Sequence, residues 1–344
     1  MEYIRNVKSK KLKNKVCLLR LDFNAEDDWR LEASLPTIKY LSKHCESVVI
    51  LGHKGRPKKR NKALSLAPYT KIISKNIKKK VSFIEDFNFQ KIKNKIDESS
   101  RGSIFLLENL RFLDGESKND EKLAKNLACL GNIYINEAFA VSHRKNASIA
   151  TITKYIDSYA GLEFEKEIKN LSKIFKNPKK PLVIVIGGNK VSGKLETIKP
   201  LYKKTYKILV GGSIYNSKFN LKSSKFLLAP DFIKKDNGFV CDLGPTSRSN
   251  FCKILEKAKT IIWNGPLGEI SERCYWVGSD SVAKCISENK KAFKIAGGGE
   301  TVMLLKKLKL DKKFDFISTG GGAMLSFISG RKLAGIEALN RNKK

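Results

Sequence analysis

Residues 182–194 read LVIVIGGNKVSGK, an unbroken run of aliphatic residues followed by two glycines and two lysines. A run that is apolar at every position is typical of a strand whose two faces are both buried, as in a parallel sheet. The glycines allow a tight turn, and Lys190 and Lys194 then fall at the start of a helix. This stretch therefore predicts a strand, a turn and a helix, the unit from which α/β folds are built.

The same apolar pattern recurs along the chain. Helix-like stretches such as Leu35 to His44 and Thr301 to Leu308 lie between the apolar runs. Strands that alternate with helices form parallel sheets with right-handed crossovers, so we predict an α/β protein. The strand-like runs are 16–23, 47–52, 81–84, 103–108, 132–135, 182–186, 207–210, 226–229, 260–263, 292–296 and 314–317.

The length of 344 residues suggests two domains, because an ordinary domain has roughly 150 residues. Strand signals pause between Thr151 and Pro181, where a charged helical segment leads to a proline-bounded loop. We expect this segment to be a connecting helix. The predicted parts are an N-terminal domain at 1–155, a hinge helix at 156–176, a C-terminal domain at 177–330 and a tail at 331–344.

The composition excludes several classes of protein. No run approaches the roughly 18 apolar residues of a membrane-spanning helix, and the first residues lack the apolar stretch of a secretion signal. We therefore expect a soluble, cytoplasmic protein. The seven cysteines are scattered and never spaced as C-x-x-C, which argues against a disulfide framework and a zinc site. We expect them to be free, buried thiols in a reducing compartment.

The formal net charge of +34 is in the range of nucleic-acid-binding proteins. The lysines, however, spread over the whole chain, and no aromatic RNA-binding signature interleaves with them. A solvated lysine surface is the favoured interpretation, and attraction to RNA or another polyanion is the alternative.

The first half of the chain places cationic and polar residues just after its strand-like runs. A guanidinium group matches a phosphate or carboxylate with two parallel hydrogen bonds. One such arginine alone is more simply a surface ion pair, but the carboxyl ends of parallel strands meet at one edge of a sheet. The set therefore predicts one shared anion pocket. Its members are Asp22, Asn24, Arg30, His53, Arg56, Arg111 and Arg144.

The second half places glycines at the corresponding positions. Gly297–Gly299 and Gly320–Gly322 each follow a strand-like run and precede a helix, where backbone amides can bind a phosphate. Neither matches G-x-G-x-x-G or G-x-x-x-x-G-K-[ST], which excludes a standard dinucleotide fold and a P-loop. Lys190 and Lys194, four residues apart, could reach one phosphate chain, although two solvated lysines are an equal alternative. The strands of the two halves end in different residues, so we predict two different ligands. The first half would bind a small polyanion and the second half a nucleotide.

Several longer segments stand in a fixed order: RLDFN from Arg20, HKGRPK from His53, LLENLRF from Leu106, GGNKVSGK from Gly187, WNGPLG from Trp263, GGGET from Gly297 and ISTGGGA from Ile317. In this order the chain resembles the phosphoglycerate kinase family from about Cys17 to Leu339. The resemblance implies two Rossmann-like, doubly wound parallel-sheet domains joined by a hinge helix. The N-terminal domain would hold 3-phosphoglycerate and the C-terminal domain the adenine nucleotide.

The resemblance also implies an activity. A phosphoryl group would move reversibly from 1,3-bisphosphoglycerate to ADP, giving 3-phosphoglycerate and ATP in glycolysis, with Mg²⁺ carried on the nucleotide phosphates. We expect a monomer without membrane or nucleic-acid partners. Closure about the connector would bring the two ligands together.

Individual residues acquire roles from the resemblance. The seven anion-pocket residues would bind phosphoglycerate, Arg30 and Lys190 would meet the transferring phosphoryl group, and Lys194 would steady the nucleotide phosphates. The implied catalytic residues are thus Arg30, Lys190 and Lys194. The implied nucleotide-binding residues are Lys194, Gly211, Gly212, Asn264, Gly298, Gly299, Glu300 and Thr301, and Glu300 would also contact the magnesium ion.

The departures from the family pattern cluster in the nucleotide half. Glu300 stands where the family has an aspartate, Ser213 replaces a glycine near the adenosine, and Ser271 replaces a glutamate that binds the ribose. The stretches from Asn216 to Leu227 and from Asp231 to Cys241 are shortened. Two alternatives follow: a weakened or inactive pseudoenzyme that serves as a scaffold, and a basic RNA-associated protein.

Overall fold

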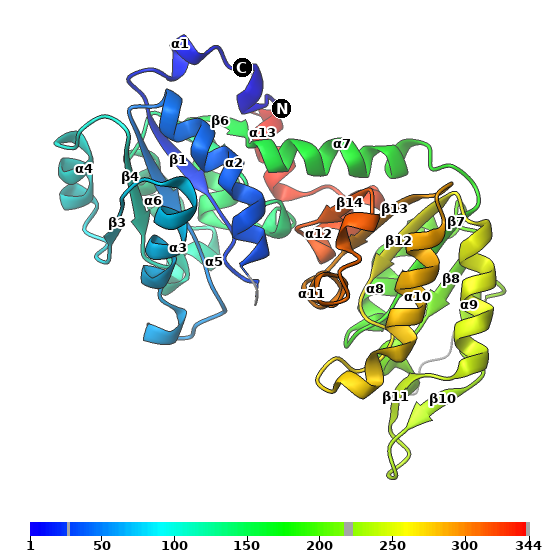
Figure 1. The fold of residues 1–344 in the computed structure, drawn as a ribbon. Helices are drawn as coiled ribbons and strands as arrows, with labels where there is room; N and C mark the ends of the chain where they lie inside the picture. Colours follow the sequence, from blue (N-terminus) through cyan, green and yellow to red (C-terminus); the bar gives the residue numbers. More distant parts are fainter. Residues whose placement is uncertain (26–27, 217–222, 342–344) are drawn as a thin grey trace. The chain divides into compact units, whose positions relative to one another are not determined.

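The computed structural model describes residues 1–25, 28–216 and 223–341 (Figure 1). The chain divides into two compact units. The first unit contains Met1–Ile168 and the C-terminal residues from Lys332, and the second contains Lys169–Arg331. Each unit is built around a six-stranded sheet in which all neighbouring strands are parallel, which confirms the predicted fold class. None of the helices in these ranges has both the length and the apolar character needed to cross a bilayer.

The sheet of the first unit has the strand order β3-β4-β2-β1-β5-β6. Its strands are β1 (Val16–Arg20), β2 (Ser47–Leu51), β3 (Val81–Ile84), β4 (Ser103–Leu107), β5 (Ile133–Asn136) and β6 (Asp157–Ala160). Its helices are α1 (Ser9–Leu12), α2 (Trp29–His44), α3 (Ala67–Ile77), α4 (Phe89–Asp97), α5 (Asp114–Lys118), α6 (Glu121–Ala128) and α13 (Ala334–Arg341).

Successive apolar residues of a central strand supply two separate cores. Leu19 packs with residues of α2 and α3 on one face of the first sheet, and Leu18 packs with residues of α4 and α6 on the other. Neighbouring strand residues point to opposite faces, so a strand covered on both sides must be apolar throughout. Arg20, at the end of β1, is in register with Leu51 and Asn136, which brings three strand ends to one edge.

The sheet of the second unit has the order β14-β13-β12-β7-β8-β9, and a separate antiparallel pair consists of β10 and β11. The strands are β7 (Leu182–Ile186), β8 (Lys207–Val210), β9 (Phe226–Leu228), β10 (Phe232–Lys234), β11 (Val240–Leu243), β12 (Thr260–Asn264), β13 (Phe293–Gly297) and β14 (Phe316–Ser318). The helices are α8 (Val191–Ile198), α9 (Pro245–Lys257), α10 (Val277–Glu288), α11 (Gly299–Lys307) and α12 (Gly321–Ile328).

Helix α7 (Leu162–Lys176) carries the chain from the first unit into the second, and the boundary between the units falls inside it. Its first turn is capped by Glu137, whose carboxylate accepts the backbone N–H groups of Glu163 and Phe164 at 3.0 Å each. Burial raises the pKa of Glu137 to about 7, against the effect of its hydrogen bonds. The last residues of the chain, from Lys332 onward, belong to the first unit again. There Gly335 donates its N–H to the carbonyl of Ser142 at 2.8 Å.

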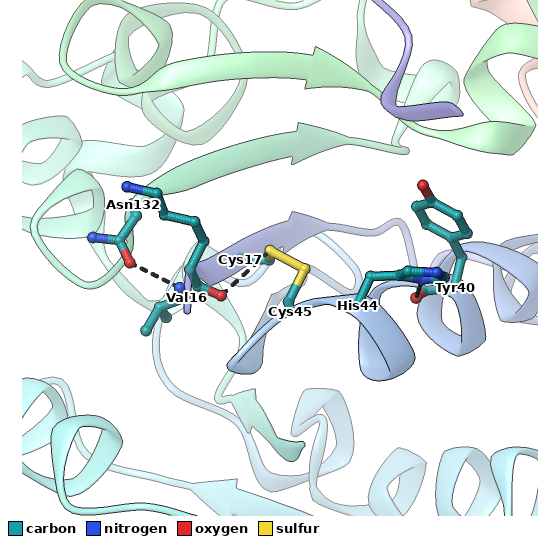
Figure 2. Close-up of a disulfide and its surroundings, with 7 residues drawn as sticks. Val16, Cys17, Tyr40, His44, Cys45 and Asn132 are labelled. Carbon is teal, nitrogen blue, oxygen red and sulfur yellow. Dashed lines mark hydrogen bonds between the residues drawn. A yellow bond between two sulfur atoms is a disulfide. The ribbon is translucent and has the colours of Figure 1, made fainter. Parts of the chain in front are cut away.

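The expectation that the cysteines are free is wrong for four of them, because each unit contains a disulfide, and the expectation that they are buried is wrong for Cys129 and Cys274. Figure 2 shows the bond between Cys17, in β1, and Cys45, which follows α2. Parallel pairing sets Val16 beside Ser47, and this register brings the two cysteines together across 28 residues of sequence. Cys252 and Cys285 join α9 to α10. The free cysteines are Cys129, Cys241 and Cys274, of which only Cys241 is buried.

Candidate active site

The loop that follows β1 carries a buried carboxylate at the centre of a hydrogen-bond network. Asp22 is 7% exposed and accepts hydrogen bonds from the backbone N–H of Asn24 at 2.9 Å, from Nδ2 of Asn24 at 2.8 Å and from Nη1 of Arg30 at 3.1 Å. Burial alone would raise the pKa of Asp22, but His53 in its protonated form, Arg30 and the hydrogen bonds from Asn24 together lower it to about 2. Asp22 is therefore ionised at neutral pH and holds Arg30 in place.

His53 is fully buried beside Asp22 and presents an unpartnered hydrogen-bond donor. Burial lowers the pKa of His53 well below 6.5, so the ring is neutral at pH 7. Its Nδ1 lies 2.9 Å from Nη1 of Arg20, and because a guanidinium group can only donate, Nδ1 accepts and Nε2 carries the proton. Among the described residues Nε2 has no hydrogen-bond partner, and the nearest carboxylate oxygen of Asp22 is 3.5 Å away. The part of the chain that the structure describes thus leaves one buried donor unsatisfied.

Arg20 fixes this arrangement, although the sequence analysis assigned it no role. It is 1% exposed, its Nη2 lies 3.2 Å from Oε1 of Glu116, and its Nε donates to Oγ of Ser148 at 2.6 Å. Ser148 in turn donates to both carboxylate oxygens of Glu116, through Oγ at 2.6 Å and through its N–H at 3.0 Å. The sequence contained one signal of this role, an arginine at the end of the otherwise apolar strand VCLLR. A charge buried in such a strand needs a partner, which would have directed attention to Arg20.

Three of the predicted arginines line a cavity of about 250 Å³, which we call the arginine cavity. Arg111 donates to the carbonyl of Gly55, whose own N–H donates to Oδ1 of Asn24 at 2.6 Å. The cavity is thereby joined to the network around Asp22. Burial, with Arg20 and Arg144 nearby, lowers the pKa of Arg111 to about 10. The cavity is lined by Arg56, Pro57, Arg111, Ser117, Arg144, Lys145 and Asn146.

The lining of the arginine cavity contains four cationic side chains and no carboxylate. Asn146 adds an acceptor, because its Oδ1 finds no partner among the described residues and the residue is 6% exposed. The site therefore suits a small polyanion that also carries a hydroxyl group. Three of the seven residues of the predicted anion pocket line this cavity, and the other four belong to the network around Asp22 that is joined to it through Gly55. Ser117, Lys145 and Asn146 also line the cavity but were not predicted.

In the second unit, a cation and a carboxylate both lie close to one glycine in the turn after β7. Gly188 has a φ of +79°, and a Cβ added there would lie 3.2 Å from Nζ of Lys194 and 3.3 Å from Oε2 of Glu300. The Nζ of Lys194 donates to the carbonyl of Gly187 at 2.7 Å. Burial lowers the pKa of Lys194 to about 8, against the effect of Glu300. The lysine is still mainly cationic at neutral pH.

Lys190 occupies a different position from Lys194. Helix α8 begins at Val191, so Lys190 is its N-cap residue, with non-helical backbone angles, and its side chain is exposed. The predicted pair therefore consists of an exposed capping lysine and a half-buried lysine one turn later.

A cavity of about 200 Å³, which we call the glycine cavity, lies beside this turn. Gly212 approaches so closely that an added Cβ would lie 2.5 Å from the backbone nitrogen of Gly188. Ser213 donates through Oγ to the carbonyl of Gly188 at 3.0 Å, so the serine closes the turn. The lining comprises Gly188, Asn189, Gly212, Ser213, Asn216, Phe239, Val240, Cys241, Pro266, Leu267, Gly268, Glu269, Ile270, Ser271 and Glu300.

Only some of the predicted nucleotide-binding residues line the glycine cavity. Gly212 and Glu300 do, whereas Gly211 packs against Leu267 outside the lining. Lys194, on α8, lies beside the Gly188 turn without lining the cavity. Asn264, Gly298, Gly299 and Thr301 gather where β12 and β13 meet α11 and α12. There Asn264 donates to the carbonyl of Gly321 at 3.2 Å, and Oγ1 of Thr301 accepts the N–H of Gly265 at 2.7 Å. Gly298 and Gly299 form the cap and first residue of α11.

The far wall of the glycine cavity comes from residues that the sequence analysis did not select. Phe239, Val240 and Cys241 belong to the β10–β11 region. Glu269 faces the same cavity, and its Oε1 accepts the hydroxyl of Ser271 at 2.9 Å. The shortened stretch from Asn216 to Leu227 includes residues 217–222, which lie outside the described residues.

The donor set at the glycine cavity fits a magnesium ion that is held mainly by phosphates. Within the described ranges, no group of three His, Cys, Asp or Glu residues could hold a metal by itself. Mg²⁺ is commonly bound through one or two carboxylates together with substrate phosphates and water. Glu300, beside the Gly188 turn, offers one such carboxylate.

Comparison with known proteins identifies the family to which the chain belongs. A family model described as phosphoglycerate kinase matches residues 7–226 and 214–331. The phosphoglycerate kinase of Thermosipho africanus is 37% identical over 389 aligned positions, covering 97% of each chain, and that of Dictyoglomus turgidum is 34% identical over 390, covering 98% of each. Both alignments are longer than the 344 residues of this chain, which therefore lacks residues that these relatives have.

Solved structures agree. Phosphoglycerate kinase from Pyrococcus horikoshii superposes with a TM-score of 0.89 at 26% identity, and that from Coxiella burnetii with 0.79 at 30%. Each match covers 99% of both chains. Matches of sequence and of fold thus extend over both units, and the chain belongs to the phosphoglycerate kinase family.

Proposed function

We propose that this protein catalyses the reversible transfer of a phosphoryl group from 1,3-bisphosphoglycerate to ADP, which gives 3-phosphoglycerate and ATP in glycolysis. The protein is a phosphotransferase with a carboxyl group as acceptor. The observation that carries the proposal is the presence of two unlike cavities in one chain, an arginine cavity in the first unit and a glycine cavity in the second.

The first unit would bind phosphoglycerate. Arg56, Arg111 and Arg144 would hold the phosphate that is not transferred, since each can form two parallel hydrogen bonds with phosphate oxygens. His53 would donate its Nε2 proton to the substrate. Asp22 and Asn24 act indirectly, because they fix Arg30 and the Gly55 turn rather than attract an anion themselves.

The second unit would bind the nucleotide. The backbone around Gly188 and Gly212 allows close approach of a phosphate chain, and Lys194 supplies a positive charge at the same place. Glu300 would contact the magnesium ion of the nucleotide. The nucleoside would extend toward Glu269 and the β10–β11 region, which form the far wall of the cavity.

The chemistry needs alignment and charge stabilisation rather than a general base. The attacking oxygen is already an anion, and the transition state of phosphoryl transfer is loose and strongly anionic. Arg30, and Lys190 at the cap of α8, would stabilise the charge on the transferring group. When bound with the nucleotide, Mg²⁺ neutralises part of the phosphate charge.

The two ligands are assigned to separate units, so transfer requires that they be brought together with water excluded. The chain passes between the units twice, within α7 and near Lys332. We place the joint at these two crossings.

The decisive experiment measures ATP formation from 1,3-bisphosphoglycerate and ADP in the presence of magnesium. We expect turnover, and we expect the double variant Lys190→Ala/Lys194→Ala to lose it. The exposed Lys203, which lines neither cavity, provides a control, and Lys203→Ala should keep the original rate. Absence of turnover with ADP, GDP and the other nucleoside diphosphates would contradict the proposal.

A further inference from the structure

A third cavity lies in the second unit, at the edge of the sheet opposite to the glycine cavity. Its volume is about 600 Å³, which is within the range of sites for small organic molecules. Thr260 and Phe293 line it, and they are register partners at the amino ends of β12 and β13. Open α/β sheets bind their usual ligands at the carboxyl ends of the strands. The cavity is therefore separate from the site of phosphoryl transfer.

Four lysines and no acidic residue line this cavity, which we call the lysine cavity. Lys169, Lys173 and Lys176 follow one another at intervals of four and three residues in α7, a spacing that places them on one face of the helix. Lys179 comes from the loop that follows. Four cations without a carboxylate in the lining favour an anion as the occupant.

The floor of the lysine cavity is apolar. Ile174 is 1% exposed and Phe293 is half-buried. The hydroxyl of Thr260 already donates to the carbonyl of Lys179 at 2.7 Å, so it does not require a polar ligand. The Nζ of Lys173 lies 4.9 Å from the centre of the Phe293 ring, which brings one of the cations directly beside the apolar floor.

Lysines near the end of a helix also compensate the negative end of its dipole. That effect accounts for the charges, but it does not account for an apolar floor beneath them or for a cavity larger than either of the other two. The lysines and the apolar floor together fit a ligand that has one anionic part and one apolar part. We propose that the lysine cavity binds a small organic anion that combines an aromatic or aliphatic part with a phosphate, sulfonate or carboxylate group.

The probe for this proposal is 8-anilinonaphthalene-1-sulfonate, a flat apolar anion whose fluorescence rises when it leaves water. With the full-length protein we expect saturable binding at one site that persists in saturating ADP, magnesium and 3-phosphoglycerate. The uncharged N-phenyl-1-naphthylamine should bind at least tenfold more weakly, because it cannot use the lysines. Displacement of the sulfonate by ADP would place it in the glycine cavity and overturn the proposal, as would equal binding of the uncharged compound.

Two variants test the location. Lys173→Glu/Lys176→Glu reverses two charges of the cavity and should weaken the sulfonate at least tenfold. Its control is Lys71→Glu/Lys75→Glu, which makes the same change of net charge on exposed positions of α3 in the first unit. Ser172→Trp keeps every lysine and fills the cavity from α7, so it should also abolish binding. Each variant should keep the circular dichroism spectrum and the thermal unfolding midpoint of the unmodified protein, which report that it is folded.

The outcomes are distinct. Loss of binding in both cavity variants and retention in the control supports the proposal. Equal weakening in the control would show attraction to the overall charge, and unchanged binding in Ser172→Trp would show that the probe lies elsewhere; either result overturns the proposal. These results do not depend on whether the protein is an active kinase, because the readout is fluorescence.

Discussion

The arginine cavity is built from side chains, whereas the glycine cavity is built largely from backbone. Around the first, buried charges hold one another in place, as Arg20 and Glu116 do beneath His53. Around the second, the close approach of Gly188 and Gly212 defines the wall, and Ser213 is accommodated by a hydrogen bond to the Gly188 carbonyl. A site that consists of interlocked charged side chains loses its geometry when one of them is removed. A site whose wall is formed by backbone atoms tolerates substitution of the side chains around it. This contrast fits the departures that the family resemblance implies, since most of those departures fall in the second unit.

The largest effect should follow removal of a buried charge from the first unit. Glu116→Ala leaves Arg20 buried without its carboxylate partner, and we expect the free energy of unfolding to fall by about 3–5 kcal/mol. Denaturant unfolding, with hydrogen exchange read from peptides of each unit, measures the loss and locates it.

The matched variant in the second unit is Asp242→Ala. Asp242 is equally buried, but its carboxylate accepts the backbone N–H groups of Gly278 at 2.6 Å and of Leu243 at 2.8 Å. Its removal strands no buried guanidinium, so the expected loss is smaller, about 1–3 kcal/mol. If the two variants lose equal free energies of unfolding, the contrast between interlocked charges in the first unit and backbone contacts in the second is contradicted.

Arg30→Ala should come next. Removal of one preorganised donor from an anionic transition state lowers kcat by about 10²- to 10³-fold. Because Arg30 belongs to the first unit, the Kd for ADP should stay within twofold of its original value. Steady-state kinetics and calorimetric titration with ADP separate the two quantities. Arg60→Ala is the control, since Arg60 is exposed and paired with Glu85; parallel losses of kcat and ADP affinity would assign Arg30 a structural role.

The same contrast explains what the sequence could predict. The run 182–186 was found with its observed bounds because a strand buried on both faces is apolar throughout. Strands β6, with the sequence DSYA, and β10, with FIK, were missed because short, partly polar strands lack such a run. Secondary structure was thus predictable where burial is uniform.

The functional residues follow a similar rule. Charged residues just after a strand, such as Arg56 and Arg111, could be selected because the position of a strand end is visible in the sequence. The residues that hold Arg20 in place could not be predicted from the sequence. Glu116 and Ser148 are 96 and 128 residues away from it and contact it only in the folded unit. The disulfide between Cys17 and Cys45 depends in the same way on strand register.

The third prediction concerns pH in the backbone-built site. The pKa of Lys194 is about 8, so in the free protein this lysine loses its charge as the pH rises through 8. Bound phosphates favour the cation, so binding takes up a proton above pH 8 and the Kd for ADP rises with pH. We expect about tenfold weaker binding at pH 9.5 than at pH 7.5, measured by titration calorimetry. Lys194→Arg keeps its charge over this range, and an equally steep rise in that variant would exclude Lys194 as the cause.

The smallest effect should come from a substitution of Glu269. The sequence indicated that a carboxylate for the ribose had been lost in this part of the chain. The family resemblance implies that Ser271 replaces a glutamate that binds the ribose. The hydroxyl of Ser271, however, donates to the carboxylate of Glu269 on the cavity wall. A carboxylate held there can accept hydrogen bonds from the sugar hydroxyls. Glu269→Gln should raise the KM for ADP about threefold to tenfold, which corresponds to one net hydrogen bond of roughly 0.7–1.4 kcal/mol, and should leave kcat unchanged.

The nucleotide itself distinguishes contact with the sugar from a change of cavity shape. The unmodified protein should prefer ADP to 2′-deoxyADP, and Glu269→Gln should reduce this preference because the lost acceptor no longer discriminates the hydroxyl. Glu272→Gln is the control, since Glu272 pairs with Lys235 at 2.7 Å but does not line the glycine cavity. If the preference is absent from the unmodified protein, or survives in Glu269→Gln, the ribose is not bound by this carboxylate. The backbone-built site would then discriminate its nucleotide by shape alone, which is the sharpest form of its contrast with the arginine cavity.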